Sequence, residues 1–262
     1  MVIIMRNIKM LLLAIGLLFI AALMQNVIAT VIYVAYKSFS DYISDESLYI
    51  FGIVAAVITG IIFGFWYWVI IRGNNYEGGK KKITEILKAT NILILISLAI
   101  GSQFFVSGVM NLIQPIFQAL FTDYAKIMDQ ILGVNLSLVL IYTIIIAPIT
   151  EELIFRGVIF YYCLSNSSFI VANICQAALF GLYHGNIVQG IYGGLLGLLL
   201  GYVRIKYRTI SASILLHIMI NASALLLNAF PGNTLGYVIM SLIGGNLLIR
   251  GILRLKTIKC YP

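Results

Sequence analysis

Long uncharged runs of apolar residues constrain the fold of this chain more than any other feature. No charged residue lies between Lys9 and Lys37, or between Arg156 and Arg204. Each of these runs exceeds the roughly 20 residues that a helix needs to cross the hydrocarbon core of a bilayer. The chain is 61% hydrophobic and 10% charged, whereas soluble domains are nearer a quarter charged. These patterns predict an all-α fold, a polytopic membrane helical bundle.

The spacing of the runs predicts about eight transmembrane helices within a single membrane domain, residues 1–262. The first run is too long for the apolar core of a cleaved signal peptide, so we expect it to be an uncleaved span. Pro115 lies in an uncharged run longer than one span needs, and we expect an interfacial or bent segment there. We place the spans at residues 10–36, 49–71, 91–110, from 134 to a turn at 165–168, 169–184, 187–203, 209–228 and 235–249.

The basic residues indicate which way the bundle is oriented. The net charge of +8 does not predict nucleic-acid binding, because the basic residues lie in short segments between apolar runs. With eight spans and both termini in the cytoplasm, 14 Lys and Arg residues fall on the cytoplasmic side and 2 outside, as the positive-inside rule requires. The three cysteines have no spacing typical of a disulfide framework or a thiolate metal site.

A short charged stretch interrupts the fourth predicted span. Glu151, Glu152 and Arg156 lie there between apolar runs, although a charge at bilayer depth costs roughly 3 kcal/mol on insertion scales. Glu152 and Arg156 are four residues apart, so they share a helix face and are expected to form an ion pair. Glu151 lies about 100° around the helix from Glu152 and is expected to point elsewhere. We interpret the rest of the chain as a scaffold for these groups.

The two histidines of the chain, His184 and His217, also fall inside apolar spans. His184 follows Phe180 by four residues, and Asn221 follows His217 by four. A carboxylate at low dielectric and a nearby histidine can activate a water, while a second histidine and an amide can stabilise an oxyanion. These groups therefore predict peptide hydrolysis inside the membrane. The alternatives are structural contacts between helices and a proton or ion path.

Three short motifs occur in order within these spans: EExxxR at residues 151–156, FxxxH at 180–184 and HxxxN at 217–221. Together they resemble the CPBP family, the CAAX protease and bacteriocin-processing intramembrane endopeptidases, also called the Abi family. The resemblance covers residues 134–228, the expected catalytic core. The spans within residues 1–133 are not diagnostic.

The resemblance implies an intramembrane endopeptidase and a role for each motif residue. Glu151 and His184 would activate the water, while His217 and Asn221 would stabilise the oxyanion or complete the site. The remaining motif residues would support them: Glu152, Arg156 and Phe180.

The same residues leave the role of a metal open. Glu151, His184 and His217 could supply three ligands of a catalytic Zn²⁺, with water in the fourth position. An HExxH motif is absent, and Glu152, the other carboxylate, is expected to pair with Arg156. We favour a water activated by glutamate and histidine without a metal, and keep a divalent metal such as Zn²⁺ as the alternative.

The expected partner is a membrane-associated peptide or protein at a bacterial plasma membrane. Leader peptides, bacteriocin or quorum-peptide precursors and prenylated CAAX-type C termini are the classes that the resemblance implies. The alternative function is a non-proteolytic immunity or regulatory partner. A small transporter would predict inverted repeats, which this sequence lacks.

The predicted spans place the two histidines at different depths. His184 falls at the outer end of span 169–184, while His217 lies only nine residues beyond the cytoplasmic Arg208. The two side chains can converge only if a helix is tilted or broken, for which Pro148 is a candidate position.

Overall fold

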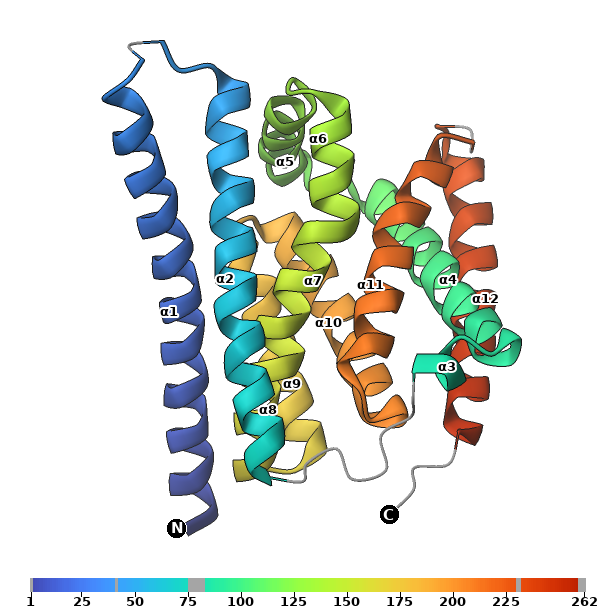
Figure 1. Cartoon of the computed structure of the whole chain (residues 1–262). Helices are drawn as coiled ribbons and strands as arrows, with labels where there is room; N and C mark the ends of the chain where they lie inside the picture. The colour runs from blue at the N-terminus through green and yellow to red at the C-terminus, as the bar shows by residue number, and fades with distance from the viewer. Residues whose placement is uncertain (1, 41, 75–82, 230–231, 259–262) are drawn as a thin grey trace.

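All regular elements of the described chain are helices, which confirms the all-α prediction (Figure 1). The computed structural model describes residues 2–40, 42–74, 83–229 and 232–258. Its elements are α1 (Val2–Lys37), α2 (Asp45–Asn74), α3 (Ile83–Ile86), α4 (Ala89–Ile113), α5 (Gln118–Leu132), α6 (Leu136–Ile141), η1 (Tyr142–Ile146), α7 (Ala147–Glu152), η2 (Leu153–Ile159), α8 (Phe160–Asn166), α9 (Phe169–Tyr183), α10 (Ile187–Tyr207), α11 (Ile210–Ser223), η3 (Ala224–Ala229) and α12 (Thr234–Thr257).

Seven stretches of the described chain are long and apolar enough to cross a membrane, so this is a multi-pass membrane protein. They are Met5–Lys37, Asp45–Ile70, Ala89–Ile113, Leu136–Asn166, Ile187–Tyr207, Ile210–Leu227 and Thr234–Thr257. The eighth predicted span corresponds to α9, which has only 15 residues. At 1.5 Å per residue it is about 22 Å long, shorter than the ~30 Å hydrocarbon core.

The helix ends agree with an even number of crossings. In Figure 1, α1 begins and α12 ends at the same end of the bundle. The segment after Pro115 forms α5, a short helix with distinct polar and apolar faces, as expected for an interfacial segment rather than a span. The extreme termini, residue 1 and residues 259–262, lie outside the described residues. That both ends are cytoplasmic remains a prediction.

The helix that carries the charged stretch is continuous over 31 residues, Leu136–Asn166, but it is not uniform. Two π-helical segments, η1 and η2, flank the α-helical turn α7. Pro148 stands at the start of α7, where it has no N–H to donate and would clash with the carbonyl four residues earlier. The wider turn of η1 accommodates that missing bond, and π segments of this kind are frequent at functional sites.

Glycines let α9 and α10 approach closely. A Cβ on Gly197 would lie 3.0 Å from the Cα atom of Ala177, and a Cβ on Gly193 would lie 3.4 Å from the ring of His184. The small residues of α10 therefore face α9, as is typical of close helix packing in membranes. This approach brings backbone carbonyls of α10 within reach of the charged stretch.

Candidate active site

The two adjacent glutamates meet one histidine. His217 of α11 lies with Nδ1 3.0 Å from Oε1 of Glu152 and with Nε2 3.7 Å from Oε2 of Glu151. Glu151 was expected to point away from Glu152, yet both carboxylates reach His217, each at a different ring nitrogen. The side chain of Glu152 is fully buried, whereas that of Glu151 is 17% exposed.

The predicted ion pair is present and buried. Arg156 of η2 donates from Nη1 to Oε1 of Glu152 at 2.8 Å, and both side chains are fully buried. Arg156 also donates from Nη2 to the carbonyl oxygen of Gly197 at 3.2 Å. The pair holds Oε1 of Glu152 in place as the acceptor for His217, because removing either charge would leave the other buried and uncompensated.

Phe180 lies at the centre of the site. Its ring centroid is 4.3 Å from the guanidinium carbon of Arg156. The rings of His184 and His217 meet it edge-on, with centroids 4.9 Å and 5.8 Å away. One buried aromatic ring therefore brings together side chains from η2, the end of α9 and α11.

In both histidines, the Nδ1 atom of the imidazole faces an oxygen atom. Nδ1 of His184 lies 2.8 Å from the carbonyl oxygen of Phe180, and Nδ1 of His217 faces Glu152. A carbonyl or a carboxylate oxygen only accepts, so Nδ1 of each ring carries a proton.

The predicted spans placed the two histidines at different depths, and the short length of α9 explains how they can meet. This helix ends at Tyr183, and Gly185 with φ +66° turns the chain back into α10. Such a left-handed conformation favours glycine. In Figure 1 the turn between α9 and α10 lies well below the ends of α2 and α6. His184 and His217 thus both contact the ring of Phe180.

Asn221 makes a contact that the motif did not reveal. Its Nδ2 donates to the carbonyl oxygen of Thr143 at 2.7 Å. Thr143 belongs to η1, where the π-helical pattern changes which carbonyls are bonded within the helix. Asn221 thus joins α11 to the helix of the glutamates, and its amide retains one further N–H.

Gln176 is a buried polar residue that sequence reasoning missed. It lies on α9 and donates from Nε2 to the carbonyl oxygen of Gly197 at 2.9 Å, the oxygen that also accepts from Arg156. The signal was available in the sequence, since Gln176 precedes Phe180 by four residues and shares a helix face with Phe180 and His184.

The side chains do not form a ready-made metal site. Glu151, His184 and His217 are donor types that Zn²⁺ accepts. Within residues 2–40, 42–74, 83–229 and 232–258, however, no three His, Cys, Asp or Glu side chains are grouped so that they could hold a metal ion. We therefore route no step through a metal.

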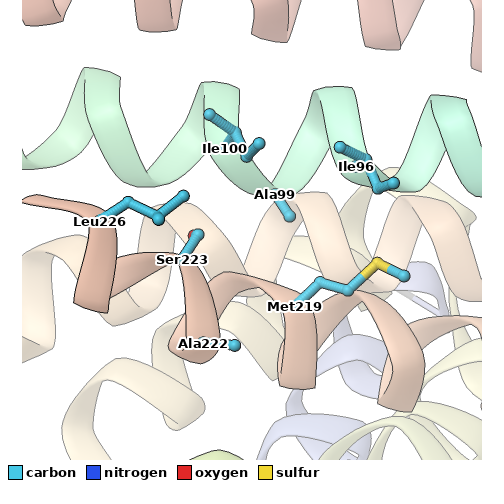
Figure 2. Close-up of a pocket in the computed structure, with 7 residues that line it drawn as sticks. All are labelled: Ile96, Ala99, Ile100, Met219, Ala222, Ser223 and Leu226. Carbon is cyan, nitrogen blue, oxygen red and sulfur yellow. The ribbon is translucent and has the colours of Figure 1, made fainter.

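A cavity of about 260 Å³ lies on the opposite side of α11 (Figure 2). It lies between α4 and α11, and the α11 residues that line it are 140–240° around the helix from His217, at 100° per residue. The lining is almost entirely apolar, so the cavity contains none of the site's chemistry. It is lined by Ile96, Ala99, Ile100, Met219, Ala222, Ser223 and Leu226.

Comparison with known proteins agrees with this geometry. Residues 133–223 match the family described as type II CAAX prenyl endopeptidase Rce1-like. This segment is therefore similar to that family. The matched residues include all three motifs and every side chain placed around Phe180 above. The motifs found in the sequence and the family match therefore lie in the same part of the chain.

One curated relative also matches. The protein of Bacillus subtilis (strain 168) named "Putative membrane peptidase YdiL" is 27% identical over 105 residues. The alignment covers 40% of this chain and 42% of the relative, so the chain spans less than half of the length of that protein. No solved structure shows a significant match.

Proposed function

We propose that this chain is an intramembrane endopeptidase that hydrolyses a peptide bond of a membrane-associated peptide or protein. The observation that carries the proposal is the placement of His217 between Glu151 and the buried Glu152–Arg156 pair. A purely structural ion pair needs no second carboxylate and no histidine. The family of residues 133–223 supports a peptide or protein substrate.

In the proposed reaction, Glu151 is the general base. It takes a proton from a water while the water oxygen bonds to the scissile carbonyl carbon, and His184 accepts the second hydrogen of that water through Nε2. His217 and the free N–H of Asn221 complete the site around the developing oxyanion. The C–N bond then breaks, and the proton held by Glu151 passes to the leaving amine.

The supporting residues keep this arrangement in place. Glu152 accepts from His217 and is itself held by Arg156, and Phe180 packs against Arg156 and both histidines. We propose a catalytic core at residues 134–228 in a single membrane domain of the bacterial plasma membrane. Leader peptides, bacteriocin or quorum-peptide precursors and prenylated C termini are the substrate classes to test.

Cleavage by the purified protein in detergent tests the proposal. Candidate leader peptides and a prenylated CAAX peptide are offered to wild type, Glu151→Gln and His184→Ala, with Glu85→Gln of α3, whose side chain is exposed, as the matched control. We expect cleavage by wild type and the control alone. Equal cleavage by all four proteins would remove Glu151 and His184 from the mechanism.

A chelator arm decides whether a divalent metal takes part. Unchanged cleavage after extensive chelation would support water activation by glutamate and histidine. Loss of cleavage that returns with added Zn²⁺ would instead identify a metalloprotease. An intact cellular phenotype of Glu151→Gln would favour a non-proteolytic immunity or regulatory partner.

A further inference from the structure

We propose that Gln176 is a positioning residue that orients the Glu152–His217 pair through Arg156. The inference rests on the proposed function and adds a residue outside the three motifs. Gln176 is fully buried and does not touch the glutamates or the histidines by hydrogen bonds. Its influence must therefore pass through a shared partner.

That partner is the carbonyl oxygen of Gly197. It accepts from Nε2 of Gln176 at 2.9 Å and from Nη2 of Arg156 at 3.2 Å. Arg156 then donates to Oε1 of Glu152 at 2.8 Å, and the same oxygen lies 3.0 Å from Nδ1 of His217. A continuous chain of hydrogen bonds thus runs from Gln176 on α9 to His217 on α11.

Gln176 is itself held by α9 and α10. Its Nε2 also lies 2.8 Å from Oδ1 and 3.1 Å from the carbonyl oxygen of Asn173, one turn earlier on α9. Asn173 in turn donates to the carbonyl oxygen of Leu198 on α10 at 3.0 Å. These bonds join the two helices at the level of Gly197, so the position of its carbonyl is defined from both sides.

The face of α9 that carries Gln176 also contacts Arg156. Gln176, Phe180 and His184 follow one another at intervals of four, so they share a face. Phe180 contacts the guanidinium of Arg156 with its ring, and Gln176 contacts the carbonyl that the same guanidinium binds. Arg156 is therefore confined by α9 and by Gly197, which leaves Glu152 with one orientation.

Substituting Gln176 by Met tests the inference, because Met has nearly the same length but no N–H. We expect kcat to fall about tenfold with KM within twofold, in the range typical of groups that orient a catalytic ligand or base. The matched control is Gln103→Met on α4, since the Gln103 amide donates to Ser107 of its own helix. A smaller folded fraction would also lower the apparent kcat at constant KM, so kcat is expressed per folded enzyme, with the folded fraction measured by thermal unfolding.

A spectroscopic arm reports on His217 without any substrate. The chain has two histidines, so ¹⁵N-histidine labelling gives two sets of ring resonances, assigned with His184→Gln. We expect Gln176→Met to shift the Nδ1–H resonance of His217 and to leave that of His184 in place. If Gln176→Met fails to accumulate, Gln176→Asn, too short to reach Gly197, gives the same spectra.

The two arms separate failure of the inference from failure of the proposed function. A shifted His217 resonance without cleavage by wild type would support the positioning role and count against the peptidase. Wild-type cleavage with an unshifted resonance and unchanged kcat in Gln176→Met would overturn the positioning role alone.

Discussion

Two pairs of helices pack closely through glycine, but their interfaces differ. Between α4 and α12, a Cβ on Gly101 would lie 2.5 Å from the backbone nitrogen of Leu248. At this interface, backbone and apolar side chains of the two helices pack together. Ser97 of α4 adds a hydrogen bond of 2.8 Å to the carbonyl oxygen of Leu247. Between α9 and α10, a Cβ on Gly197 would lie 3.2 Å from Nη2 of Arg156.

The difference shows what each pair of helices does. Close packing between α4 and α12 joins two apolar surfaces, and it is expected to affect stability alone. Close packing between α9 and α10 places the carbonyl oxygen of Gly197 within hydrogen-bond distance of the buried Arg156 guanidinium. It is therefore expected to affect both stability and the rate of cleavage. Close helix packing through glycine is therefore expected to affect stability alone where the neighbouring side chains are apolar. Where a charged side chain contacts the interface, it is expected to affect both stability and catalysis.

The largest effect is expected from the two neighbouring glutamates. Glu152→Gln leaves Arg156 buried and uncompensated, so we expect a loss of about 3–5 kcal/mol of stability together with loss of cleavage. Glu151→Gln removes a partly exposed base, so cleavage should fall by about 10²–10⁴-fold while stability stays within about 0.5 kcal/mol. Thermal unfolding in detergent, measured beside peptide cleavage, gives both values. Equal stability losses in the two variants would contradict the assignment of Glu152 to the support.

Arg156→Lys tests whether the geometry of the guanidinium matters beyond its charge. A lysine ammonium lacks the planar fork that lets Arg156 bond both Glu152 and the carbonyl of Gly197. We expect cleavage to fall about 10–100-fold, measured as kcat/KM. Arg250→Lys on α12, where the side chain is exposed, is the control and should match wild type. Full activity of Arg156→Lys would mean that charge alone suffices.

A matched pair of glycine substitutions compares the two interfaces directly. Gly101→Ala places a Cβ against the backbone of α12 and is expected to cost about 1–3 kcal/mol, with an unchanged kcat for the folded enzyme. Gly197→Ala is expected to cost a similar stability and also to lower kcat about tenfold, because Arg156 must move. Active-site titration of the folded fraction separates the two quantities. If both alanine variants kept the wild-type kcat, the α9–α10 interface would be structural only.

The smallest effect is expected from Ser97→Ala. This change removes the hydroxyl that bridges α4 and α12, and hydrogen bonds between transmembrane helices contribute about 0.6 kcal/mol on average. Thermal unfolding should show this small loss, with no change in cleavage. Ser102→Ala, whose hydroxyl bonds its own helix at the carbonyl of Ala99, is the control. A change in kcat for Ser97→Ala would link the α4–α12 pair to the chemistry.

The sequence alone determined the class of fold and the polar residues of the site. Runs of apolar residues have a length set by the bilayer, so the helices could be predicted, although α1 begins and α12 ends eight residues beyond the predicted spans. Glu152 and Arg156 could be paired from their spacing, because four residues bring two side chains to one helix face. Charges and histidines in such runs are costly, so they were visible as a group before any contact was known.

Only the tertiary structure decided how these groups meet. Spacing along one helix says nothing of the angle between helices, so the position of His217 between two glutamates came from packing. The bounds of α9 were predicted within one residue, but a hydropathy pattern does not record how deep this helix lies among its neighbours. Gln176 stayed hidden for the same reason: an amide in an apolar helix is ordinary until the carbonyl of Gly197 and the guanidinium of Arg156 are placed beside it.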